Sequence, residues 1–170
     1  MSRGTPIVIL LVSLVWCVTL GAAKKQGWQY TSWGMSPEQV VRASAGEARL
    51  ISDQDKPGER ILGDVEKVRG HSTSGSLRFD TQFFFDSNNG LSLVILTLQG
   101  DPRQNYPILE TALLGKYGAP IEDKFSRFDR KRRWVSGNTV ELDQVGSPPT
   151  VPTLVQLYYW PAPQVPTIHK

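Results

Sequence analysis

The sequence is poor in the residues that carry most protein chemistry. Its 170 residues include one cysteine, Cys17, and two histidines, His71 and His169. Cys17 lies in an apolar run near the N-terminus, so the rest of the chain has no cysteine for a disulfide, a thiolate zinc site or a cysteine nucleophile. A domain of about 150 residues can still be stable through its apolar core alone.

The excess of positive over negative charge is also small. The chain has 19 lysines and arginines against 16 aspartates and glutamates, which leaves a formal net charge of +3. Non-specific nucleic-acid binding would need a concentrated basic patch rather than so small a global excess. Because residues 1–23 also predict export of the chain, we do not expect nucleic acid as the partner.

Residues 1–23 predict a cleaved secretory signal peptide. Arg3 supplies a positive charge, residues 7–20 form an almost unbroken apolar run, and small residues follow where signal peptidase cleaves. The run is short for a membrane span, which needs about 20 apolar residues, and an uncleaved anchor is the alternative. Trp16 stands before Cys17 where a lipoprotein signal needs a small residue, so we expect a periplasmic or secreted protein without a lipid anchor.

Two helices are expected within a single α+β domain at residues 24–160. Ser36 with Pro37 and Gln39 predicts an N-cap with a capping box, and Gly46 predicts the end of that helix. A second helix is expected at 104–117, before Gly118. The last residues, 161–170, form a proline-rich tail.

Six strands are expected around these helices. Alternation of apolar and polar residues, or an apolar run between turn residues, predicts strands at 61–69, 77–86, 91–98, 132–135, 139–143 and 154–160. A polar loop at 52–60 precedes the first strand, and Asn88-Asn89-Gly90 predicts a hairpin.

The expected order is αβββ twice, as in a tandem repeat with halves at 28–100 and 101–160. The repeat predicts that Gly70 and Gly137 are equivalent, each following the first strand of its half. Two such units predict a two-layer fold in which one antiparallel sheet carries both helices on the same face.

Two short stretches carry a resemblance to known families. The helix start Gly34-Met35-Ser36, followed by Val40, resembles the Gly-Met-Thr/Ser signature of the SmpA/OmlA lipoproteins, and the tandem order is similar to the β-lactamase inhibitor protein fold. Residues 113–120 resemble a helix ending of proteins of that type. The chain lacks the lipoprotein cysteine motif and the cysteines of the inhibitor family. The resemblance implies a small periplasmic interaction module and carries over no catalytic residue.

Two motifs imitate catalytic or metal-binding loops. Residues 70–75 come close to the Gly-x-Ser-x-Gly nucleophile elbow, and a hydrolase would use His71 with a nearby serine. Because a strand-turn-strand is expected there, a polar hairpin loop is the favoured interpretation. Residues 53–64 partly match a calcium loop, but Pro57 and Asp64 occupy positions that favour other residues, so a plain connector is expected. No metal and no cofactor are predicted.

The strongest local anomaly is a basic segment at 127–133, with five cations in seven residues and a tryptophan beside them. The candidate binding residues are Arg127, Arg130, Lys131, Arg132, Arg133 and Trp134. Such a segment can bind phosphate groups of lipid or lipopolysaccharide, or an acidic protein. The alternative is an exposed edge strand whose charges block sheet-to-sheet association.

Aromatic residues gather at both ends of the expected domain, around Trp28 and around Trp160. Such rings either fill the core or form an interface. Together, these features predict an exported, non-enzymatic binding module whose partner is another envelope or secreted protein. The alternative function is a binder of anionic envelope components through residues 127–133.

Overall fold

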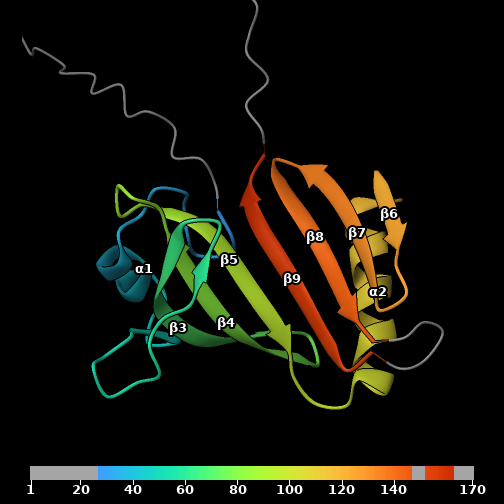
Figure 1. Cartoon of the computed structure of the whole chain (residues 1–170), viewed down its shortest axis with the longest axis horizontal. Coiled ribbons are helices and arrows are strands. Elements are labelled where there is room, and N and C mark those ends of the chain that lie inside the picture. The colour runs from blue at the N-terminus through green and yellow to red at the C-terminus, as the bar shows by residue number, and fades with distance from the viewer. Residues whose placement is uncertain (1–26, 147–151, 163–170) are drawn as a thin grey trace, which may run out of the picture.

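A computed structural model of the chain describes residues 27–146 and 152–162 (Figure 1). The predicted signal peptide and the proline-rich tail from residue 163 onward lie outside the described residues. Within the described ranges, neither helix is both long and apolar enough to cross a membrane.

The first helix, α1, spans Pro37–Ala43 and begins as predicted. The Ser36 side chain accepts a hydrogen bond from the Gln39 backbone N–H, and the Gln39 side chain accepts one from the Ser36 N–H at 2.9 Å. This reciprocal pair satisfies N–H groups that have no partner within the helix. The helix gives way to a turn at Ala45 and Gly46, which both have positive φ angles.

The second helix, α2, spans Pro102–Tyr117 and starts two residues before the predicted boundary. The reason is local, because the Asp101 side chain accepts a hydrogen bond from Arg103 N–H at 2.9 Å and Pro102 occupies the first turn. Gly118, with φ 74°, ends the helix as predicted.

All the strands belong to one antiparallel sheet. Their bounds are β1 Ala48–Leu50, β2 Arg60–Ile61, β3 Asp64–Ser74, β4 Leu77–Phe85, β5 Leu91–Leu98, β6 Glu122–Phe125, β7 Asp129–Ser136, β8 Asn138–Val145 and β9 Leu154–Pro161. The spatial order is β1-β3-β4-β5-β9-β8-β7-β6, with β2 paired to β3 outside this path.

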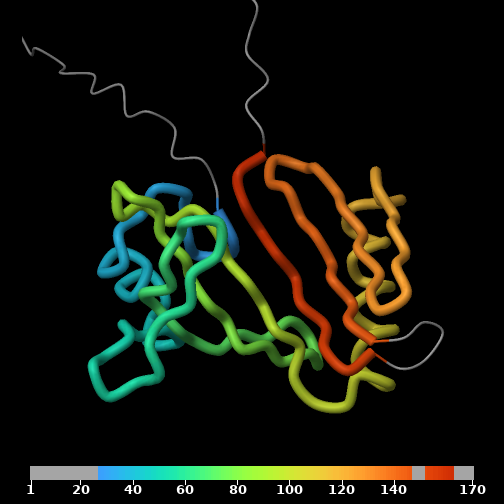
Figure 2. The backbone as a smooth tube through the Cα atoms, viewed as in Figure 1, coloured from blue at the N-terminus to red at the C-terminus, as the bar shows by residue number. Residues whose placement is uncertain are grey.

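The tandem arrangement is present, but the first unit has two strands more than predicted, β1 and β2, and the second unit has one more, β6. In each unit the helix is followed by a short outer strand, β1 or β6, and then by a three-stranded meander that pairs with it. We call α1 to β5 the first unit and α2 to β9 the second unit. Their last strands, β5 and β9, pair with each other, so the two units meet at the centre of the sheet (Figures 1 and 2).

The predicted equivalence of Gly70 and Gly137 is wrong. The structural counterpart of Gly137 is Gly75, since each lies in the turn between the first two strands of its meander, with φ 70° and 59°. Gly70 instead lies inside β3, which runs on to Ser74 and pairs there with Leu77. The predicted loop at 70–75 is therefore mostly strand.

The two faces of the sheet differ. On the helix face, buried side chains of both units form one core under the two helices, including Val40 of α1 and Leu109 of α2. This is the predicted two-layer α+β arrangement with both helices on one face. The opposite side, which we call the open face, carries the side chains that alternate with the core positions along the strands, and neither helix covers it.

Candidate functional site

The basic segment lies on β7, inside the sheet. Strand β7 pairs with β8 on one side and with β6 on the other, so β6 forms the outer edge of this unit. The interpretation of the basic segment as an exposed edge strand is therefore wrong. Strand β6 was not predicted, because it is a short, mostly polar strand at Glu122–Phe125 whose formation depends on pairing with β7.

Two candidate binding residues of the segment are buried on the helix face. The Arg132 side chain is only 3% exposed and its guanidinium donates to the Glu110 carboxylate and the Tyr106 hydroxyl of α2. Trp134 is 2% exposed, and its indole N–H donates to the Gly118 carbonyl at 3.0 Å. Both residues dock α2 onto the sheet.

The remaining strand cations are paired with carboxylates. Arg130 binds Asp123 at 2.6 Å on the helix side, and its guanidinium lowers the pKa of that carboxyl. On the open face, Lys131 pairs with Asp143 at 3.0 Å, and this contact raises the pKa of Lys131. Arg133 binds carboxylates on both neighbouring strands, at 2.7 and 3.1 Å. The local excess of positive charge is thus largely neutralised within the fold.

Arg127 lies apart from these pairs, at the tip of the β6–β7 hairpin. The Ser126 hydroxyl accepts hydrogen bonds from the N–H groups of Phe128 and Asp129, both at 3.1 Å, which orders the tip. Phe125 and Phe128 are 63% and 62% exposed, and the Arg127 guanidinium lies 5.3 Å from the Phe128 ring centre. The tip therefore presents two aromatic rings beside a cation.

The centre of the open face is apolar and aromatic. Phe84, Leu93 and Ile95 are buried there, although no helix covers them. Tyr158 and Trp160 of β9 pack against these residues and remain partly exposed. Burial, and next the charge of Asp143, raises the pKa of Tyr158, so its hydroxyl stays protonated. We call Tyr158, Trp160 and the three residues beneath them the aromatic centre.

A polar chain fixes one ring of the aromatic centre. The Tyr158 hydroxyl donates to the Gln156 side-chain oxygen at 2.9 Å, and the Gln156 amide donates to the Thr97 hydroxyl at 3.1 Å. These contacts join β9 of the second unit to β5 of the first. The aromatic centre is therefore formed by both units together.

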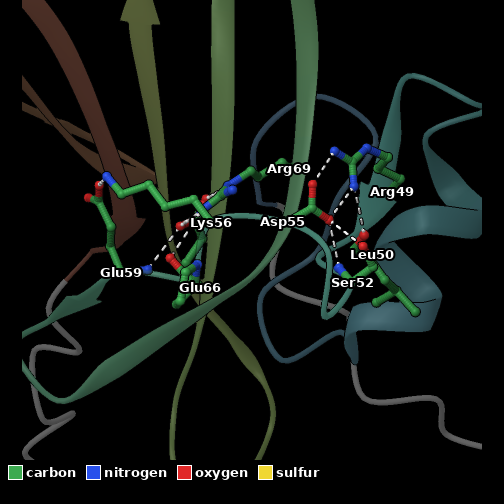
Figure 3. Close-up of polar contacts among 9 residues, drawn as sticks. Arg49, Leu50, Ser52, Asp55, Lys56, Glu59, Glu66 and Arg69 are labelled. Carbon is green, nitrogen blue, oxygen red and sulfur yellow. Dashed lines mark hydrogen bonds and ion pairs between the residues drawn. The ribbon is translucent and has the colours of Figure 1, made fainter.

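The first unit contributes a charged flank on the other side of the aromatic centre. Glu66 has a fully buried side chain, and the Arg69 guanidinium binds it at 2.6 and 2.9 Å (Figure 3). Burial alone would raise the pKa of Glu66, but Arg69, the Glu59 backbone N–H and the Gln82 side chain outweigh it and lower that pKa. A groove of about 500 Å³, lined in part by Arg69 and His71, lies on this flank.

A second ion pair holds the preceding loop. The Arg49 guanidinium donates to both carboxylate oxygens of Asp55 at 2.7 Å, and the backbone N–H of Ser52 donates to the same carboxylate (Figure 3). In the predicted calcium-like stretch, Asp55 is thus engaged by arginine, while Asp64 accepts from the Ser92 hydroxyl at 2.5 Å. Within the described ranges no group of acids, histidines or cysteines is placed to hold a metal ion.

His71 does not meet a serine. Its Nδ1 lies 2.8 Å from a carboxylate oxygen of Asp80 on the open face. Ser72 alternates to the helix face, where its hydroxyl is 3.0 Å from that of Thr81. The serine and the histidine that a hydrolase would need are therefore on opposite sides of β3.

Comparisons with known proteins give a weak likeness of fold. No protein-family model matches the chain, and no match is found among curated proteins. Among solved structures, the chain is similar to the crystal structure of a DUF4309 family protein, YjgB of Bacillus subtilis subsp. subtilis str. 168. The two share 17% sequence identity at a TM-score of 0.40, over 72% of this chain and 76% of that one.

Proposed function

We propose that this chain is a non-enzymatic, exported binding module of the bacterial periplasm that recognises a protein partner through the open face of its sheet. The observation that carries the proposal is the aromatic centre, in which Tyr158 and Trp160 are held partly exposed over buried apolar residues. Tyrosine and tryptophan in the middle of a surface are the residue types that contribute most to protein–protein affinity.

The flanks of the open face also favour a protein as the partner. Cations and anions occur together on both sides of the aromatic centre. Arg69 pairs with Glu66 on the side of β3, and Lys131 pairs with Asp143 on the side of β7 and β8. A surface of mixed sign complements another folded protein better than it complements a uniformly anionic membrane or polymer. A charged rim around an aromatic centre is the usual composition of such interfaces.

The fold adds a further part to this proposal. Two helix-and-strand units joined through one sheet are what the resemblance to the β-lactamase inhibitor protein implies. The stretch Gly34-Met35-Ser36 at the start of α1, followed by Val40, is the feature that resembles the SmpA/OmlA lipoproteins. We propose a relationship to these small envelope modules at the level of fold.

Chemical crosslinking in intact cells that export the chain tests the proposal. We expect one discrete crosslinked product with the unaltered chain. A double variant, Tyr158→Ala with Trp160→Ala, should reduce that product about tenfold or more, because interface anchors each contribute roughly 2 kcal/mol. The matched control is Phe125→Ala with Phe128→Ala, which removes two exposed rings elsewhere.

Equal product from both double variants, with both folded as judged by circular dichroism, would show that the open face does not bind the partner. Loss of the crosslinked product from the control variant alone would show that the β6–β7 hairpin, and not the open face, binds the partner. Absence of any discrete product with the unaltered chain would contradict a stable protein partner.

A second candidate function is binding to an anionic envelope surface, and the β6–β7 hairpin tip favours it. Arg130, Lys131, Arg132 and Arg133 are paired with carboxylates, but in the described part of the chain no carboxylate lies within ion-pair distance of Arg127. Aromatic rings beside a cation suit the boundary between lipid headgroups and acyl chains.

Vesicle flotation distinguishes this candidate. Phosphatidylglycerol vesicles should bind the chain, phosphatidylcholine vesicles should not, and Phe125→Ser with Phe128→Ser should remove the binding. Leu50→Ser, at an exposed apolar residue of β1 on the opposite edge of the sheet, is the control. Unchanged flotation of the phenylalanine variant would rule the hairpin tip out.

A further inference from the structure

A cleft lies on the helix face, away from the open face. It is bounded by α2, by residues 27–29 and by the end of the β3–β4 hairpin, and it has a volume of about 790 Å³. Cavities of about 300–1,000 Å³ are typical of small-molecule sites. The cleft lies over the seam of the two units, since Leu96 of β5 and Leu157 of β9, which pair with each other, both line it.

The floor of the cleft is apolar. Leu77, Phe79 and Leu96 of the first unit line it together with Leu157 of the second, and Leu109 and Leu113 of α2 form a wall. These side chains belong to the main core, so their positions are fixed by packing on all other sides. A rigid apolar floor favours a ligand with a hydrocarbon body, because burial of such a body gains about 0.8 kcal/mol per methylene.

The charge of the cleft has one sign. Among the described residues that line it, Lys116 is the only charged one, and no aspartate or glutamate is present. Lys116 lies in the last turn of α2, with its ammonium 4.9 Å from the centre of the Tyr117 ring, and it is exposed. Elsewhere on this protein most cations of the sheet are paired with carboxylates, so the composition of this cleft favours an anion from outside the chain.

We infer that the cleft binds a small amphipathic molecule, with its hydrocarbon body on the Leu77–Leu157 floor and an anionic headgroup paired with Lys116. A carboxylate and a phosphate monoester share the required charge. This site is independent of the proposed protein interface, which is on the other side of the sheet.

Titration with single-chain probes tests the inference. The chain, purified as cells export it, is titrated with dodecanoate, dodecyl phosphate and dodecyltrimethylammonium below their micellar concentrations. Isothermal calorimetry gives the stoichiometry, and tryptophan fluorescence reports the site, because Trp28 lines the cleft. We expect one anionic molecule per chain, and binding of the ammonium probe about tenfold or more weaker. The relative affinity of carboxylate and phosphate identifies the preferred headgroup.

Two pairs of variants place the ligand. Ala112→Trp puts a large ring at a cleft-lining position of α2 and should abolish binding, whereas Thr111→Trp, at the adjacent exposed position outside the cleft, should not. Lys116→Gln should weaken the anionic probes about tenfold and should not weaken the ammonium probe, because the variant removes a charge of the same sign as that probe. Arg103→Gln removes an exposed cation of the same helix outside the cleft and should have no effect.

Failure of both anionic probes to bind the unaltered chain would overturn the inference. Equal affinity for the cationic and anionic probes would overturn it as well, as would undiminished binding to Ala112→Trp. Should Ala112→Trp lose its thermal unfolding transition, Lys116→Gln decides alone, because it changes an exposed side chain. These outcomes do not depend on crosslinking to a protein partner, so either proposal can fail without the other.

Discussion

At the scale of single residues, each buried charged side chain in the described part of the chain has a partner of opposite charge. Glu66 and Arg132 have almost no exposed side-chain surface, and each is held by an opposite charge, Arg69 and Glu110 respectively. Burial of an unpaired charge costs several kcal/mol, so loss of one partner is expected to be far more damaging than loss of a surface pair.

Replacement of Glu66 tests this expectation for the ion pair of Glu66 with Arg69. We expect Glu66→Gln to be less stable than the unaltered chain at pH 7, by about 1–3 kcal/mol, since the Arg69 pairing is lost. The pKa of Glu66 is lowered in the folded state, so its stabilising effect is fully present above the unfolded value of about 4.3 and is lost as the pH falls through the folded pKa. Denaturant unfolding between pH 7 and pH 3 measures the difference.

The difference in unfolding free energy between Glu66→Gln and the unaltered chain should therefore shrink in acid. Glu59→Gln, which changes an exposed carboxylate 3.6 Å from Lys56, is the control and should have little effect at any pH. A stability difference that stays constant down to pH 3 would contradict the pairing.

Gly70 is required where β3 pairs with β1 and approaches the residue before it. A Cβ at this position would lie 2.4 Å from the Glu47 carbonyl oxygen and 2.9 Å from the Ala48 Cβ. Gly70→Ala should therefore destabilise the fold by about 1–3 kcal/mol. Gly115→Ala, within α2 and with open space around the new Cβ, should stabilise it by about 0.5–1 kcal/mol. Thermal unfolding of the two variants measures both shifts, and shifts of the same sign would refute this explanation.

At the scale of elements, local signals predicted the helices and long-range pairing decided the rest. The capping box at Ser36 and the stop at Gly118 act within a few residues, so the sequence could reveal them. Strands β1 and β6 are only three and four residues long, too short for a pattern of alternation, and they exist because β3 and β7 pair with them. The partners of the basic segment come from α2, β6 and β8, which no local pattern could indicate.

The basic segment therefore divides into a structural and an exposed part. Arg132→Ser should destabilise the fold by about 2–4 kcal/mol, because Glu110 and Tyr106 lose the guanidinium that docks α2. Arg127→Ser, at the hairpin tip, should change stability by no more than about 0.5 kcal/mol. Differential scanning calorimetry compares them. Equal losses would mean that Arg132 is not a docking residue.

At the scale of the whole molecule, the two units share one sheet and one core. The β5–β9 pairing joins them, and the Trp33 indole of the N-terminal region donates to the Asn138 side chain of the second unit at 2.8 Å. The sequence predicted this general plan from the tandem order. It did not reveal that the pairing of β5 with β9 places Tyr158 and Trp160 over the seam, because that depends on which strands become neighbours.

A shared core predicts one cooperative unfolding transition. Leu142→Ala, in β8, should cost about 2–5 kcal/mol, because the residue is 1% exposed. Hydrogen exchange should show the same loss of protection in β4 of the first unit as in β8 of the second. Unchanged protection in β4 would show that the units unfold independently.

Recognition through the open face is tested most directly by site-specific photo-crosslinking in cells that export the chain. A photo-reactive residue is placed at Leu154, an exposed position of β9 on the open face, and in a separate chain at Arg103, an exposed position of α2. We expect one discrete protein adduct from position 154 and none from position 103. Adducts of equal yield from both positions, or an adduct from position 103 alone, would contradict it.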